Sequence, residues 1–357
     1  MQNLLSICIA TYNREKEVEE CVRNCLEVVD KYTEVIVCDN CSTDNTKERL
    51  ERIVDSRFKY YRNEKNIGYS NILKVLMYAT SRYALILNEK DNLDTDGLKE
   101  LISVLKKQEI IAVVYGNYRG GEGRTGCRYG EGGVYKYSDI FDNKYMHWWW
   151  GGYSSGIVYN TKLLHKVEAE IDKSTYLWKL YPFRYAEILM YPYGDIVNLG
   201  CDLVCFQRKC IADVHAWSAG GDVRDVYWTV YSGYAQIKEW VDVFARVYDE
   251  HTLIKLMRYF GGKAFKHAVT SYYSLMTKDF CVEKMPALKE LYAFDLNKSR
   301  RVWRVWVREN YKQLWSDMIR KWYVNKLPFA IRHPIVTTWA IAYYIVVQKF
   351  IQQHFER

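Results

Sequence analysis

Short apolar runs alternate with amphipathic segments along the first third of the chain. Residues 4–10, 34–38 and 83–87 are mostly apolar and are bounded by polar residues, which is the pattern of buried strands. Between the first two runs, apolar residues recur from Val18 to Val29 at the spacing of one helix face. Further strands are expected at 58–62, 110–115 and 197–206, and further helices near Asp44, Ser70 and Leu98. This order predicts an α/β fold with an open, mostly parallel sheet flanked by helices.

Polar residues follow three of these predicted strands. The chain reads TYN at 11–13, DN at 39–40 and EKD at 89–91. Ligands of open parallel sheets bind beyond the carboxyl ends of the strands, so we expect the three clusters to meet at one crevice. A dinucleotide site would need a GxGxxG turn after the first strand, and ATYNRE contains no glycine.

Four segments, in this order along the chain, resemble family 2 glycosyltransferases of the GT-A fold. They are SICIATYNR at 6–14, VIVCDNCSTDNT at 35–46, RNEKNIGYSNIL at 62–73 and LILNEKDNLDTDGL at 85–98. The resemblance covers residues 1–165, is faint up to 220 and is absent beyond. It implies a Rossmann-like GT-A domain over residues 1–222. It also implies an inverting enzyme that moves a sugar from a nucleotide diphosphate, with UDP expected, during capsule, O-antigen or similar polysaccharide synthesis.

The resemblance assigns roles to residues at the strand ends. Thr11 and Tyr12 would line the base and ribose of the donor. Asp39 would accept a hydrogen bond from the base. Asn66 and Gly68 match the segment that closes over the nucleotide.

The acidic cluster matches the metal-binding motif of the same family, which is usually two aspartates flanking one residue. Glu89 and Asp91 would hold Mn²⁺ or Mg²⁺ on the donor diphosphate, and Asp91 is the stronger catalytic candidate of the pair. Residues i and i+2 beyond a strand face the same side, which would leave Lys90 pointing away from the metal or against a phosphate. His215 is the expected late ligand of the metal shell.

The segment HWWWGGYSSGIVYNTKLL at 147–164 resembles the part of these enzymes that lies under the acceptor. Trp149 and Trp150 are expected to contact the acceptor because indole faces stack on sugar rings. Ser154 and Ser155 belong to the Gly/Ser turn of the same segment.

Inverting transfer needs a general base for the acceptor hydroxyl. The family usually places a Glu-Asp pair after the Gly/Ser turn, and that pair is not found here. We assign the role to Glu187, with Asp195 and Asp222 as alternatives. The non-catalytic alternative for Glu187 is a charged residue on the surface of a helix.

Basic character is concentrated at the C-terminal end. The net charge is +8, yet residues 298–357 hold 12 Lys/Arg against 3 Asp/Glu, so the remainder is close to neutral. The apolar run at 335–347 is shorter than the roughly 20 residues that span a bilayer, and long enough to lie in its interface. We therefore expect a helical, aromatic-rich extension over 223–357 whose basic tail docks on the cytoplasmic membrane surface. Packing of that tail into a core is the alternative, and nucleic acid is not an expected partner.

The chain has ten cysteines and no CxxC pair. Several lie within apolar patterns, where cysteine behaves as a small hydrophobe, and no secretory h-region precedes the first strand. These features predict reduced thiols and a cytoplasmic enzyme, peripheral on the inner face of the cell membrane. Its acceptor would be a glycan or an undecaprenyl-linked glycan, and homo-oligomer formation is left open. The rivals are a nucleotidyltransferase, which would need a glycine- and basic-rich loop after the first strand, and a membrane-docked, nucleotide-binding pseudo-glycosyltransferase without turnover.

Overall fold

The computed structural model describes residues 3–107, 110–120, 125–126, 132–138, 154–175, 178, 181–206, 243–244 and 246–249. The chain divides into two compact units, Met1–Tyr227 with Glu239–Lys255, and Trp228–Lys238 with Leu256–Arg357. All described residues belong to the first unit. The helical extension and basic tail predicted from residue 223 onward therefore lie outside the described residues, apart from two short pieces at 243–244 and 246–249.

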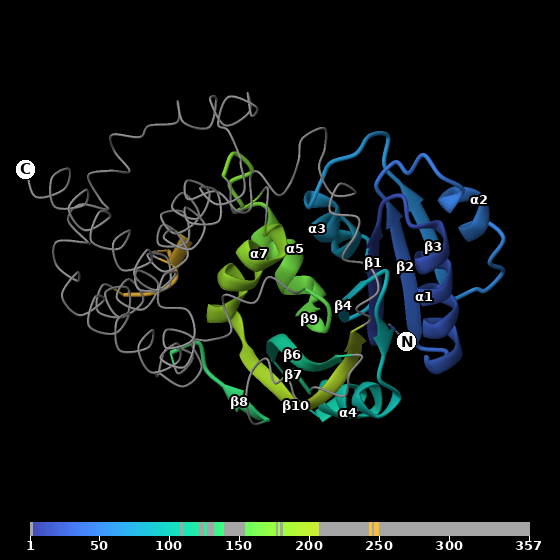
Figure 1. Cartoon of the computed structure of the whole chain (residues 1–357). Coiled ribbons are helices and arrows are strands. Elements are labelled where there is room, and N and C mark those ends of the chain that lie inside the picture. Colours follow the sequence, from blue (N-terminus) through green and yellow to red (C-terminus); the bar gives the residue numbers. More distant parts are fainter. Residues whose placement is uncertain are drawn as a thin grey trace, which may run out of the picture. The chain divides into compact units, whose positions relative to one another are not determined.

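The described unit is built around one mixed sheet (Figure 1). Its strands are β1 (Leu5–Thr11), β2 (Thr33–Asp39), β3 (Phe58–Arg62), β4 (Tyr83–Asn88), β5 (Asn92–Leu93), β6 (Ile111–Gly120), β7 (Thr125–Gly126), β8 (Gly133–Tyr135), β9 (Ile157–Asn160) and β10 (Asp195–Phe206). They are ordered β3-β2-β1-β4-β9-β6-β10-β5, with β7 beside β6 and β8 beside β10. The first four strands of that order are parallel, as are β6 and β10, while β9 runs antiparallel to both of its neighbours.

Helices pack on both faces of the sheet (Figure 1). They are α1 (Glu15–Val28), α2 (Thr46–Leu50), α3 (Ser70–Met77), α4 (Thr95–Lys107), α5 (Thr161–Glu168), α7 (Pro182–Met190) and the 3₁₀ turn η3 (Tyr191–Tyr193). The expected helices at 18–29, 70 and 98 are confirmed. Ser70, however, is the first residue of α3 rather than its cap, and the preceding Tyr69 makes no side-chain cap.

The register of the parallel strands brings their carboxyl ends to one edge. Thr11 at the end of β1 pairs with Asp39 at the end of β2, and Ala10 pairs with Asn88 at the end of β4. The polar residues that follow these strands therefore start from the same edge of the sheet, as expected for a ligand site. On one face of β4, Leu85 and Leu87 join the core that includes the apolar side of α1.

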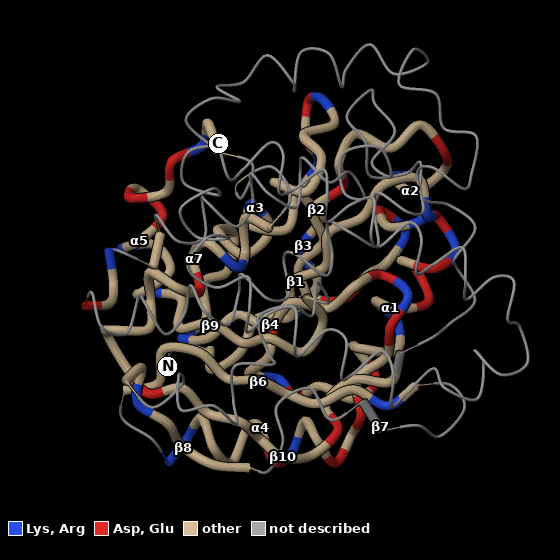
Figure 2. The backbone as a smooth tube through the Cα atoms, turned by 60° about the vertical axis from the view of Figure 1, so that its left-hand side comes forward, with Lys and Arg blue, Asp and Glu red and all other residues tan. Residues whose placement is uncertain are grey.

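Lys/Arg and Asp/Glu positions are interspersed along the described loops and helices (Figure 2). This mixture accords with the nearly neutral body that the sequence gives once residues 298–357 are set aside. Among the helices of the described ranges, none is both long enough and apolar enough to cross a membrane.

Candidate functional site

The loops that follow β1 and β2 are held together by reciprocal capping. Asp44 Oδ2 accepts a hydrogen bond of 3.1 Å from the backbone N–H of Glu15, the first residue of α1. Glu15 Oε2 in turn accepts one of 2.9 Å from the backbone N–H of Asn45, just before α2. Asp44 Oδ1 also accepts from the Thr46 N–H at 3.1 Å, but the N-cap position of α2 is Asn45 rather than the predicted Asp44. Two helix N-termini are thereby tied to each other beside the end of β1.

Asp39 is fixed from three directions at the end of β2. Its Oδ1 accepts the Ser42 N–H at 2.8 Å, and its Oδ2 accepts Tyr60 Oη at 2.9 Å and Arg62 Nη1 at 3.3 Å. The pKa of the Tyr60 hydroxyl is raised, mainly by burial and secondly by the Asp39 carboxylate. The hydroxyl therefore stays protonated and donates to Asp39. Asp39 and Thr11 are both fully buried, so their contact with a base stays a prediction. Tyr60 and Arg62 were not singled out from the sequence.

Asparagine side chains hold the segment after β3 against the same edge. Asn40 Nδ2 donates to Asn66 Oδ1 at 2.8 Å and to the Gly68 carbonyl at 3.2 Å. Asn63 Nδ2 donates to Asn40 Oδ1 at 2.9 Å and to Asn71 Oδ1 at 2.8 Å. Gly68 has φ +62, a left-handed conformation that glycine adopts at little cost. The sequence analysis picked out Asn66, Gly68 and the cluster that contains Asn40, and it missed Asn63 and Asn71.

The turn after β4 carries the acidic cluster. It is closed by the Asp91 N–H, which donates to the Asn88 carbonyl at 2.9 Å. Glu89 and Asp91 are 1% and 0% exposed, and Arg14 Nε lies 2.8 Å from Glu89 Oε1. Cys21 of α1 donates from its Sγ to the Asp91 carbonyl at 3.3 Å. Glu89 thus meets the residue that precedes α1, and the backbone at Asp91 meets α1 itself, while a common side for the two carboxylates stays a prediction.

These carboxylates do not fit a metal ion that must also touch a diphosphate. Burial raises the pKa of Glu89 to about 7 against the opposing charge of Arg14. A divalent cation at this carboxylate would lie beside the Arg14 guanidinium, which already neutralises it. Within the described ranges, no three His, Cys, Asp or Glu side chains are grouped to hold a metal. His215 lies outside the described residues.

The turn after β4 also contacts the expected acceptor segment. Ser154 Oγ donates to Asn88 Oδ1 at 3.1 Å, and the Asn88 N–H donates to Ser155 Oγ at 3.1 Å. The following Gly156 has φ +86, and a Cβ there would come within 3.3 Å of the Gly116 carbonyl. The Gly/Ser turn is therefore anchored to the end of β4. Trp149 and Trp150 lie outside the described residues.

The position of Glu187 corrects its assignment as general base. It is 1% exposed on α7, and Arg184 Nη1 lies 2.8 Å from its Oε1 and 3.0 Å from its Oε2. Tyr191 Oη donates to Oε1 at 2.6 Å, and Tyr115 Oη donates to the same oxygen. A carboxylate enclosed in this way cannot reach an acceptor hydroxyl, and it is not a helix-surface charge either. Asp195 is ion-paired with Lys136, and Asp222 lies outside the described residues.

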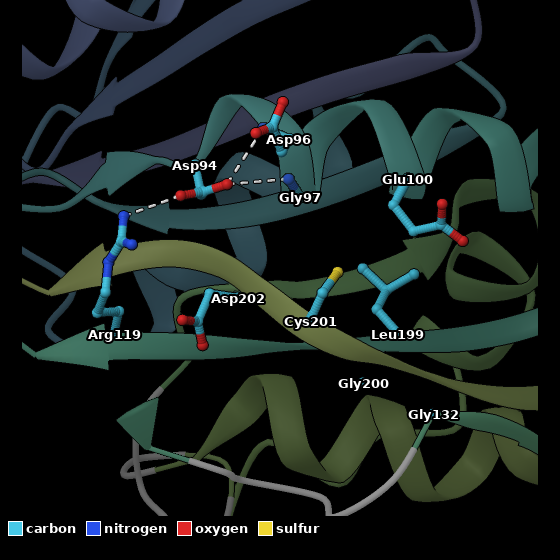
Figure 3. Close-up of a pocket in the computed structure, with 10 residues that line it drawn as sticks. All are labelled: Asp94, Asp96, Gly97, Glu100, Arg119, Gly132, Leu199, Gly200, Cys201 and Asp202. Atoms are coloured by element: carbon cyan, nitrogen blue, oxygen red, sulfur yellow. Dashed lines mark hydrogen bonds and ion pairs between the residues drawn. The ribbon is translucent and has the colours of Figure 1, made fainter. Parts of the chain in front are cut away.

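A separate shallow pocket of about 630 Å³ lies between the start of α4 and β10 (Figure 3). Its acidic lining is accounted for by local structure. Asp94 Oδ1 caps α4 by accepting the N–H groups of Asp96 at 3.1 Å and Gly97 at 3.0 Å. Its Oδ2 pairs with Arg119 at 3.0 Å. Gly97 is required because a Cβ there would lie 2.0 Å from the Asp202 carbonyl. Asp94 and Gly97 therefore have structural roles where α4 packs on β10.

Comparison with known proteins gives consistent matches to the N-terminal part of the chain. Residues 6–167 match the family model "Glycosyl transferase family 2". The glucosyltransferase WfgD of Escherichia coli, named as acting with UDP-Glc on α-D-GlcNAc-diphosphoundecaprenol, is 32% identical over 116 residues, 32% of this chain and 46% of the relative. The abequosyltransferase RfbV of Salmonella typhimurium is 33% identical over 112 residues, 29% of this chain and 33% of the relative. The chain thus spans less than half the length of these curated relatives.

The fold agrees with that match. The structure of S. aureus TarS residues 1–349 in complex with UDP-GlcNAc superposes with a TM-score of 0.62 at 16% identity, covering 89% of this chain and 92% of that one. At that identity the likeness speaks for the fold, which is the GT-A arrangement expected from the sequence. Residues 6–167 are therefore similar to family 2 glycosyltransferases, and the sheet of the described unit has the GT-A arrangement.

Proposed function

We propose that this chain transfers a sugar from a nucleotide-diphosphate donor, with UDP-sugars the first candidates, to a lipid-linked glycan acceptor in bacterial surface-polysaccharide synthesis. The observation that carries the proposal is the edge formed by β1, β2 and β4, which lies inside the segment matched by the family model. There the buried Asp39, its partners and the asparagine-held loop at 63–68 form one connected polar site. The printed names of relatives that act on diphosphoundecaprenol-linked glycans support the choice of acceptor.

Transfer with inversion is the finer part of the proposal. The acceptor hydroxyl oxygen attacks the anomeric carbon from the face opposite the leaving group. The bond from that carbon to the diphosphate oxygen breaks, its electron pair stays on the nucleotide, and the hydroxyl proton passes to a base. Since Glu187 is enclosed, the base comes from another residue. Mn²⁺ or Mg²⁺, which the resemblance led us to expect, has no part in this proposal because Glu89 and Asp91 are buried and Glu89 is paired with Arg14.

Titration of UDP into the full chain tests the donor site. Wild type is expected to bind UDP, and Asp39→Asn to weaken binding about 10-fold or more, because the variant disturbs the carboxylate that Tyr60 and Arg62 hold in place. Asp96→Asn is the matched control, since Asp96 is 89% exposed at the start of α4. Equal UDP affinity in wild type and Asp39→Asn would contradict the assignment of this edge as the donor site.

Nucleotide binding without turnover is the second candidate function. It is favoured by one observation, the enclosure of Glu187 by Arg184, Tyr115 and Tyr191, which leaves no general base identified within the described ranges. Release of nucleoside diphosphate from a nucleotide sugar would separate the two functions. A chain that binds UDP and releases none from any donor, with any acceptor, is the pseudo-enzyme.

A further inference from the structure

The turn after β4 has an inward side and an accessible side. Glu89 and Asp91 are buried, whereas Asn88 and Lys90 are partly exposed. The turn starts at the edge where β1 and β2 also end, because Asn88 pairs with Ala10 in the adjacent strand. Whatever ligand reaches this strand end therefore meets an amide and an ammonium group rather than two carboxylates.

Contacts with the start of α1 explain the burial of the two acids. Leu85 and Leu87 belong to the core that includes the apolar side of α1, and β4 ends at Asn88, so Glu89 and Asp91 lie in the turn that follows. Glu89 meets Arg14 at 2.8 Å, next to the start of α1, and the backbone carbonyl of Asp91 meets Cys21 of α1. Lys90 comes between them and is partly exposed. The ion pair with Arg14 gives Glu89 a structural partner, so Glu89 is not available to a ligand.

A nucleoside diphosphate brings negative charge to this edge, and that charge must be balanced. A metal held by carboxylates is one way to do so, and the acids here are not placed for it. A lysine ammonium is another, because it acts as a strong point charge toward phosphate oxygens. Resting on the proposed function, we propose that Lys90 binds the diphosphate of the nucleotide donor and that this chain binds its donor nucleotide without a divalent cation.

Calorimetric titration of the full chain with UDP, GDP, CDP and dTDP, each in EDTA and in Mn²⁺, tests the proposal. The best diphosphate is expected to bind with the same affinity, within about threefold, in the two conditions. Lys90→Ala should weaken that diphosphate about 10- to 100-fold, the loss of one charge-assisted contact, while the affinity for the matching nucleoside stays unchanged. Lys90→Arg should restore most of the affinity. Lys106→Ala, at an exposed position of α4, is the control and should bind as wild type does.

The outcomes separate this inference from the proposed function. Binding that appears only with Mn²⁺, or Lys90→Ala with wild-type affinity, overturns the inference and leaves the glycosyltransferase proposal standing. An equal loss of nucleoside and diphosphate affinity in Lys90→Ala also overturns it, since the lysine would then shape the pocket rather than contact phosphate. If no diphosphate binds in either condition, the proposed function itself fails.

Discussion

Arg14 and Glu89 join the start of α1 to the turn after β4 through a buried ion pair, with Nε 2.8 Å from Oε1. Arg14 is 5% exposed and Glu89 is 1% exposed, so neither charge is balanced by water. The pair explains how a glutamate occupies a position that resembles a metal ligand and yet serves to anchor the turn.

Removing the arginine should destabilise the protein strongly. Arg14→Ala leaves Glu89 buried without its counter-charge, and loss of one partner of a buried pair costs about 3–5 kcal/mol. The double variant Arg14→Met/Glu89→Leu should recover much of that loss, because an apolar pair of similar size needs no charge compensation. Urea unfolding of the three proteins measures the free energies. A loss below about 1 kcal/mol in Arg14→Ala would show that the pair does not anchor the turn.

Acid should destabilise the protein through Glu34. This carboxylate is 2% exposed, and although burial favours its neutral form, hydrogen bonds from Lys59, Ser6 and Thr80 hold its pKa at about 2. A folded pKa below the unfolded value of about 4.5 adds stability at neutral pH that is lost as the pH falls from about 4.5 toward 2. The loss should approach about 3 kcal/mol.

Unfolding in urea over that pH range measures this effect, with Glu34→Gln as the comparison. The variant should be less stable at pH 7 and should lack most of the acid-dependent loss below about pH 4.5. If the free energy of unfolding fell by the same amount below about pH 4.5 in wild type and variant, the acid effect would belong to other carboxylates.

Glu187 should behave as a structural residue. Glu187→Ala removes the carboxylate that pairs with the buried Arg184 and should cost about 3–5 kcal/mol of stability. Glu187→Gln keeps the shape and an acceptor for Tyr191 but loses the charge, so its melting temperature should also fall. Thermal unfolding and nucleotide release are measured on both variants. A Gln variant that melts like wild type yet loses about 100-fold or more in turnover would restore Glu187 as the base.

The asparagine network should couple stability to nucleotide affinity. Asn63→Ala removes the donor to both Asn40 and Asn71; Asn40 Oδ1 keeps the Ile67 N–H at 2.9 Å, whereas Asn71 Oδ1 loses its donor, at a cost of about 1–3 kcal/mol. The loop at 63–68 then loses part of its support, so UDP affinity should fall as well. Asn24→Ala, which removes a single hydrogen bond to Asn92, is the matched control and should leave UDP binding unchanged. Wild-type affinity in Asn63→Ala would show that the loop does not contact nucleotide.

Much of the fold could be predicted because strand and helix periods are strong in residues 4–120. The expected strand at 58–62 matches β3, and the polar residues after β1, β2 and β4 do meet at one edge. The spacing of Glu89 and Asp91 predicts one common side of the turn, and both residues are buried. Spacing alone could not say whether they face a crevice or a helix. The answer depended on Arg14, which is 75 residues away in sequence and was read only as part of a motif.

Partners distant in sequence also explain the other gaps. Glu187 was chosen because it lies in the nearest segment after the Gly/Ser turn that offers an acid, but Tyr115 reaches it from β6. Asp39 was recognised from its motif, whereas Tyr60 and Arg62 lie on an adjacent strand whose alternation marked them only as sheet residues. In each case the local pattern gave the element and its face, and the tertiary contact decided the role.

The most direct measurement is release of nucleoside diphosphate by the full chain from UDP-, GDP-, CDP- and dTDP-sugars, with bacterial membrane extract supplying lipid-linked glycans. At least one donor is expected to give acceptor-dependent release that continues in EDTA, and Asp39→Asn should reduce it about 10-fold or more while Asp96→Asn does not. No release from any donor, with or without Mn²⁺, would contradict the assignment of this chain as a working glycosyltransferase.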